Sequence, residues 1–147
     1  MKSFDVEACR CKLARHYKKT AKIPTSVWAS VAQVRLEKLY TRLSWVKKEQ
    51  TPTGPSEEKL RHYTDLFTPE KDGYIPKRLL VQGETGIGKN TFVKKLAVDW
   101  AELDVTEMTD EQKHALRKFK LVVVIPLKDV STCETLEEVV EFGLKYT

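Results

Sequence analysis

Apolar residues near the N-terminus recur at the spacing of an α-helix. Successive members lie three or four positions apart, which places them on one helical face: Val6, Cys9, Leu13 and Tyr17. The pattern predicts an amphipathic helix over residues 4–19, buried on one side. Ile23-Pro24 ends this helix, because proline cannot continue the hydrogen-bond ladder.

The next apolar stretch, residues 28–45, fits two periodicities. Leu36, Leu39, Tyr40 and Leu43 follow helical spacing, whereas Val34 and Leu36 alternate as in a strand. We interpret this stretch as ambiguous, with helix favoured. Residues 52–56 (PTGPS) then form a turn-rich linker, after which Ser56 is positioned to N-cap a helix over residues 57–67.

Elements in the second half of the chain alternate between strand and helix. A continuous apolar run predicts a strand over residues 78–82, as expected for a sheet covered on both faces. The helix after it runs to about Leu103. Three further elements are predicted: a short helix opened by the capping box at residues 109–112, a β-branched strand over residues 119–125, and a helix from the capping box at 135–138 to about Tyr146.

This order predicts an α/β fold. A strand, a helix and a second strand imply a parallel pair with a right-handed crossover. Together with a glycine-rich loop at residues 83–91, between the first strand and its helix, this order predicts a partial P-loop NTPase with parallel strands and crossover helices, preceded by a mainly helical N-terminal region. We expect a helical region at 1–50, a linker and helix at 51–77, and a truncated P-loop domain at 78–147.

Between the first predicted strand and its helix lies a glycine-rich loop, which we expect to bind a nucleotide through Gly83, Glu84, Thr85, Gly86, Ile87, Gly88, Lys89, Asn90 and Thr91. Its three glycines allow positive φ and bring several N–H groups near one point. The following helix adds the positive end of its dipole. Lys89 reaches the outer phosphates as a point charge. The predicted cofactor is ATP or ADP.

One position departs from the P-loop pattern. The strict motif has a serine or threonine after the lysine, and this chain has Asn90. That hydroxyl normally ligates Mg²⁺, and Thr91 is turned about 100° away along the helix. We expect phosphate binding with weakened Mg²⁺ coordination.

The sequence also speaks against hydrolysis. A P-loop hydrolase needs a carboxylate at the end of another strand, but the second predicted strand ends in Pro126, and Asp129 lies too far beyond it. We therefore assign no catalytic residue and no metal ligand. Two strands are too few for a stable open sheet, so we expect the chain to be a fragment or truncated form of a longer ATPase domain.

Bulk properties narrow the class of protein. The 147 residues fit one ordinary domain, and 41% hydrophobic with 32% charged residues is the composition of a soluble globular protein. The net charge of +5 comes from dispersed lysines and arginines, which favours solvated helix faces over a nucleic-acid interface. No run approaches the roughly 20 apolar residues of a membrane span, and no signal core is present. We expect a cytoplasmic protein without nucleic-acid or membrane partners.

Several segments together resemble a known family. The sequence RLLVQGETGIGK at 78–89, with FVKKLAVDW at 92–100, is similar to the start of the NACHT NTPase domain. The sequence FKLVVVIPLKDV at 119–130 resembles the second strand of that domain, and YTDLF at 63–67 resembles the region just before it in NOD-like receptors. The likeness covers the second half of the chain well and the first half weakly.

The resemblance implies a signal-transduction ATPase of the numerous-domain type, which binds ATP or ADP and switches between closed and oligomeric states in cytosolic innate immune signalling. It places Tyr63 and Thr64 near the adenine, although core packing is an equal alternative for Tyr63. Homotypic or related-receptor partners follow from it. The alternative function is a nucleotide-independent adaptor or decoy that binds related full-length receptors through its helical N-terminal region.

Overall fold

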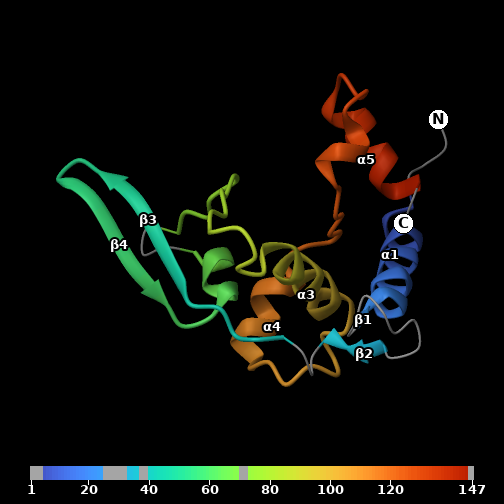
Figure 1. Cartoon of the computed structure of the whole chain (residues 1–147), viewed down its shortest axis with the longest axis horizontal. Helices are drawn as coiled ribbons and strands as arrows, with labels where there is room; N and C mark the ends of the chain where they lie inside the picture. Colours follow the sequence, from blue (N-terminus) through green and yellow to red (C-terminus); the bar gives the residue numbers. More distant parts are fainter. Residues whose placement is uncertain (1–4, 25–32, 37–39, 70–72, 146–147) are drawn as a thin grey trace. The chain divides into compact units, whose positions relative to one another are not determined.

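The computed structural model describes residues 5–24, 33–36, 40–69 and 73–145 (Figure 1). The chain forms two compact units. The first unit contains Met1–Tyr40, Gly83–Thr106 and Phe119–Thr147, and the second contains Thr41–Gln82 and Glu107–Lys118. Both helices and strands are present, which confirms a mixed α/β composition. The predicted division at 1–50, 51–77 and 78–147 stays a prediction.

The predicted N-terminal helix is present as α1 (Val6–Thr20). Asp5 caps it by accepting hydrogen bonds from the amides of Glu7 and Ala8, both at 3.0 Å. Leu13 and Tyr17 are buried as the helical spacing predicts, whereas Val6 is exposed and Cys9 is half-buried. The burial pattern leaves one side of α1 toward solvent.

The helix after the glycine-rich loop is α3 (Lys89–Ala101), and its predicted path is confirmed. Phe92, Ala97 and Trp100 of this helix are buried, whereas Val93 is 38% exposed. Ala97 and Trp100 join Leu13 and Tyr17 in the core of the first unit. The Trp100 indole also donates to the Phe119 carbonyl at 2.9 Å, which ties α3 to the segment that follows. Asp99, a buried carboxylate on the same helix, is paired with Lys95.

The predicted strand over residues 119–125 is wrong: this segment forms no ladder with any strand of the described part of the chain. Instead, the Tyr17 hydroxyl donates to the Val122 carbonyl at 2.9 Å and accepts from the Val124 amide at 3.1 Å. A residue of a parallel neighbouring strand would bond the same two groups. A helix side chain therefore takes the place that the sequence pattern assigns to a strand.

The predicted strand over residues 78–82 is also absent. Leu79, Leu80 and Val81 are 42%, 82% and 38% exposed, so this apolar run is not buried between two layers of the fold. A strand exists only where its backbone finds a partner, and no described segment supplies one. The predicted parallel sheet is accordingly not formed within the described residues.

Two antiparallel strand pairs occur where the sequence favoured helix. In the first unit, β1 (Lys22–Pro24) pairs with β2 (Gln33–Arg35). In the second unit, β3 (Trp45–Thr51) pairs with β4 (Gly54–Leu60) through a two-residue turn. These strands contradict a mainly helical N-terminal region. Trp28, Val31 and Leu39, on which that prediction also depended, lie outside the described residues.

The β3–β4 hairpin replaces the predicted helix over residues 57–67. Glu57, which we expected in the first turn of that helix, forms an ion pair of 2.7 Å with Lys48 on the opposite strand. Gly54 begins β4 with φ +126°, a value that favours glycine. The rest of the predicted helix is reduced to the 3-10 helix η1 (Tyr63–Phe67), against which α4 (Asp110–Arg117) packs.

Both capping boxes are confirmed as helix starts. Thr109 caps α4, and its amide bonds the Gln112 side chain in return. The Thr135 hydroxyl accepts from the Glu138 amide at 3.2 Å at the start of α5 (Leu136–Lys145), which follows η2 (Leu127–Val130). None of the helices in the described part of the chain combines the length and apolar character that crossing a lipid bilayer requires.

Candidate functional site

The glycine-rich loop leads directly into α3, as the sequence predicts. Gly86 and Gly88 have φ of +84° and +106°, so the predicted left-handed conformation is confirmed at these two positions and is not found at Gly83. Gly88 is the N-cap of α3 and provides no side-chain cap. The amide of Phe92 closes the first helical turn on the Gly88 carbonyl at 2.8 Å. The helix therefore begins on glycine with its N-terminal end uncovered by a capping side chain.

Lys89 folds back over the loop that precedes it. Its ammonium donates to the carbonyls of Gly83 and Glu84 at 2.7 and 2.8 Å. A side chain at position 83 would crowd this turn, because a Cβ there would lie 3.0 Å from Cγ2 of Ile87. A positive charge is therefore held beside the loop backbone, in the first turn of α3.

The loop is accessible to a ligand. Residues 83–87 are all exposed, and Gly88 and Lys89 are half-buried. One amide is already used within the loop, since Ile87 donates to the Glu84 carbonyl at 3.3 Å. The structure thus brings together Gly83, Glu84 and Lys89 at an open turn, while Thr85 and Gly86 extend toward solvent.

The residues after the lysine fit Mg²⁺ poorly. Asn90 is exposed and supplies an amide in place of the hydroxyl that usually follows a P-loop lysine, and Thr91 is half-buried. Within the described residues, no three His, Cys, Asp or Glu side chains gather in an arrangement that would hold a metal ion. We therefore derive no step through a metal.

Tyr63 and Thr64 lie in η1 of the second unit. Their exposed fractions are 2% and 1%, so both side chains are packed inside that unit, in agreement with the core-packing alternative for Tyr63. His62, Thr64 and Asp65 cap this short helix: the Thr64 amide donates to His62 Nδ1 at 3.3 Å, and the His62 amide donates to Asp65 Oδ2 at 3.0 Å.

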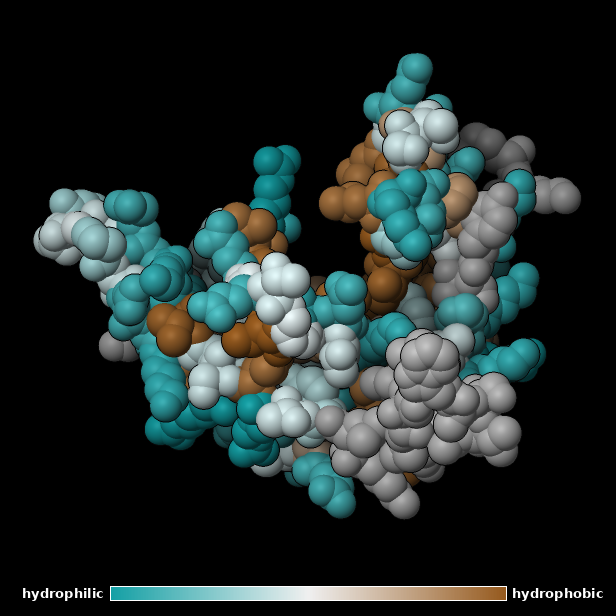
Figure 2. All heavy atoms as spheres, viewed as in Figure 1, coloured by the Kyte–Doolittle hydropathy of each residue, from teal (hydrophilic) through white to brown (hydrophobic). Residues whose placement is uncertain are grey.

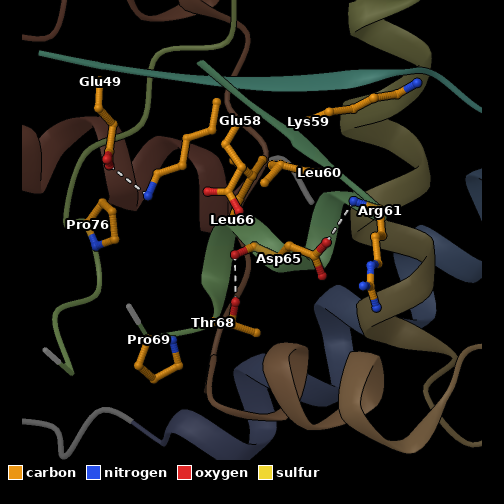
Figure 3. Close-up of a pocket in the computed structure, with 11 residues that line it drawn as sticks. Glu49, Glu58, Lys59, Leu60, Arg61, Asp65, Leu66, Thr68, Pro69 and Pro76 are labelled. Atoms are coloured by element: carbon orange, nitrogen blue, oxygen red, sulfur yellow. Dashed lines mark hydrogen bonds and ion pairs between the residues drawn. The ribbon is translucent and has the colours of Figure 1, made fainter. Parts of the chain in front are cut away.

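The second unit contains a cavity of about 720 Å³ that the sequence did not predict (Figure 3). The hairpin forms one wall and η1 another, with Pro69 and Pro76 at the side. Its charged lining residues balance, with three cations and three anions: Lys47, Lys59, Arg61, Glu49, Glu58 and Asp65. Lys47 is already paired with Glu49 at 2.7 Å. The charges therefore favour neither a polyanion nor a cation.

The sequence contains a signal for the hairpin that forms one wall of this cavity. Two lysines at 47 and 48 and two glutamates at 57 and 58 stand on either side of a Pro-Thr-Gly-Pro turn. Opposite charges at matching distances from a turn are typical of cross-strand pairs in a hairpin. The helix predicted over residues 57–67 would instead have both glutamates in its first turn.

Comparison with known proteins gives a partial similarity. A segment of 39 residues, 26% of the chain, is 38% identical to the NACHT, LRR and PYD domains-containing protein 1 homolog of Danio rerio. The matched segment covers 3% of the length of that protein. No protein-family model matches the chain, and no solved structure matches it. The similarity to a protein with NACHT in its name is therefore distant and partial.

Proposed function

We propose that the glycine-rich loop binds ATP or ADP through its backbone amides, the N-terminal end of α3 and Lys89. The observation that carries the proposal is the position of the Lys89 ammonium, 2.7 Å from the Gly83 carbonyl and 2.8 Å from that of Glu84. A phosphate that approached this turn would meet a positive charge and the positive end of a helix dipole together.

The exposed loop supports an open rather than an enclosed site. Glu84, Thr85 and Gly86 are all exposed, so a nucleotide would reach the backbone without displacing a packed side chain. Asn90 argues for binding that depends weakly on Mg²⁺. The proposed role is therefore a nucleotide-binding switch module, in which the chain senses ATP or ADP without hydrolysing it.

The partial similarity supports the biological context of the proposal. A relative whose name contains NACHT points to a signalling NTPase, and we propose that this chain contributes the first part of such a domain. A role in innate immune signalling and a cytoplasmic location both rest on this relationship.

Titration with a fluorescent ATP analogue tests the proposal. Replacing Lys89→Ala removes a charge-assisted contact to phosphate worth about 2 kcal/mol, so we expect affinity to fall about thirtyfold. Lys94→Ala is the matched control, because Lys94 is an exposed lysine of the same helix outside the loop. Equal binding by the wild type and both variants would refute the proposal.

A nucleotide-independent adaptor is the second candidate. Asn90, an exposed amide where a metal-binding hydroxyl is expected, favours it. In that case Lys89→Ala would leave the association of the full chain with a related full-length receptor unchanged, and no nucleotide analogue would bind the wild type. Loss of that association in Lys89→Ala would contradict the adaptor hypothesis.

A further inference from the structure

The exposed side of α1 is strongly basic. Leu13 and Tyr17 face the core, and successive helical residues are turned by about 100°, so the opposite side presents one set of exposed cations: Lys12, Arg15, Lys18 and Lys19. We call this set the basic face. No ion pair joins it to a carboxylate within the described residues. Four like charges close together favour an anionic partner.

A complementary surface lies on α5 of the same unit. Gly143 is buried, and a Cβ there would lie 2.6 Å from Cγ1 of Val123, so this side of α5 is pressed against the core. The opposite side carries the exposed carboxylates Glu137, Glu138 and Glu141, which we call the acidic face. Figure 2 shows hydrophilic side chains over part of α5 and at the outer edge of α1.

The spacing of charges matches when the two helices run antiparallel. Aligning Arg15 with Glu137 places Lys12 within one residue of Glu141, a displacement of about 1.5 Å along the axis. A parallel alignment of Arg15 with Glu137 places Lys19 opposite Glu141, so the spacing of charges matches in either direction.

We propose that the basic face of α1 docks the acidic face of α5 from a second copy of this chain. Charge complementarity selects this partner, because both surfaces are exposed, belong to one unit and match in the spacing of their charges. The contact is heterologous: different surfaces of two identical chains meet. It is independent of nucleotide binding, since none of its residues lies in the glycine-rich loop.

Sedimentation velocity of the full chain tests the contact. In about 0.05 M salt we expect the average mass to rise with protein concentration, and in about 0.5 M salt we expect this rise to disappear, because exposed charges are screened. Reversal of two cations, Lys12→Glu with Arg15→Glu, should weaken association about tenfold or more. Reversal of two anions, Glu137→Lys with Glu141→Lys, should do the same.

Mixing the two reversed variants provides the decisive arm. Each variant alone presents like charges on α1 and α5. In the mixture, the α1 made acidic in the first variant meets the α5 made basic in the second, so association should return. Its return would also show that both variants are folded. The matched control is Lys118→Glu with Lys120→Glu, which makes the same charge change at exposed positions outside both faces and should associate normally.

Three results would overturn the proposal. The first is a monomeric wild type at every concentration in low salt, as would occur if α1 and α5 paired within one chain. The second is association that neither reversal weakens. The third is a mixture that stays dissociated although circular dichroism shows both variants to be helical. Lys89→Ala should associate like the wild type, which separates this test from that of nucleotide binding.

Discussion

The Tyr17 hydroxyl is expected to hold residues 121–125 in place, and Tyr17→Phe tests this directly. The substitution keeps the aromatic ring, which packs edge-on against Trp100 at 6.3 Å between centroids, so no cavity is created. It removes the one atom that bonds both the Val122 carbonyl and the Val124 amide. The perturbation is therefore confined to two hydrogen bonds.

The expected cost follows from the groups left behind. An unsatisfied buried backbone group costs about 1–3 kcal/mol, and residues 121–125 are half-buried, so water offsets part of the loss. We expect the two groups together to cost about 2 kcal/mol. Opening of this segment should then become about thirtyfold more frequent.

Amide hydrogen exchange measured by NMR reads out this opening at the Val124 amide itself. Exchange there should accelerate about thirtyfold in Tyr17→Phe. Tyr74→Phe is the control, because Tyr74 is 56% exposed and should leave Val124 unchanged. A change of less than about twofold at Val124 in Tyr17→Phe would refute the assigned role, since 2 kcal/mol could not then be stored in these bonds.

The same variant isolates a pH effect. Burial raises the pKa of the Tyr17 hydroxyl above its ordinary value of 10.0, although the hydrogen bond from the Val124 amide opposes that shift. The folded state therefore holds this proton more tightly than the unfolded state. The resulting stability is present below pH 10.0 and is lost as pH rises through the higher folded pKa. Above pH 10.0, the free energy of unfolding measured with urea should therefore fall more steeply with pH for the wild type than for Tyr17→Phe.

Two further substitutions test α5 and the glycine-rich loop. Gly143→Ala should destabilise the protein by about 1–2 kcal/mol in urea unfolding, because the added Cβ meets Val123 and Ile125 at 2.6 and 2.9 Å, which outweighs the better helix propensity of alanine; a stabilised variant would contradict this packing. Asn90→Thr should make analogue binding more dependent on Mg²⁺, measured as the ratio of affinities with and without the ion. An unchanged ratio would count against the effect assigned to Asn90.

The helices α1, α3 and α4 were predictable from the sequence because their determinants are local. Asp5 and Thr109 lie within three residues of the amides they cap, and Leu13 and Tyr17 are separated by one turn. Each signal is contained in a short window, and the structure places α1, α3 and α4 where those signals indicate. Propensity, capping and periodicity agree in these helices.

Strands failed because their determinants are distant. Residues 119–125 are β-branched and apolar, which favours a strand, but the group that bonds Val122 and Val124 belongs to a tyrosine more than 100 positions earlier. Nothing in the local pattern indicates that partner. At Glu57 and Glu58 the failure was different, since the hairpin partner lies nearby and the opposite charges at Lys47 and Lys48 were available as a signal.

The candidate site depends on local determinants alone, which explains why its loop can be assembled without the predicted strands. Gly88 supplies the positive φ that starts α3, and Lys89 then returns to the Gly83 and Glu84 carbonyls within the same turn. Phosphate binding in such a loop requires amides and one ammonium at a helix start. A parallel sheet would add rigidity to that arrangement, because it would fix the residues before Gly83. Because residues 78–82 form no ladder, we infer that the loop is held in place by α3, which follows it, and not by the residues before it.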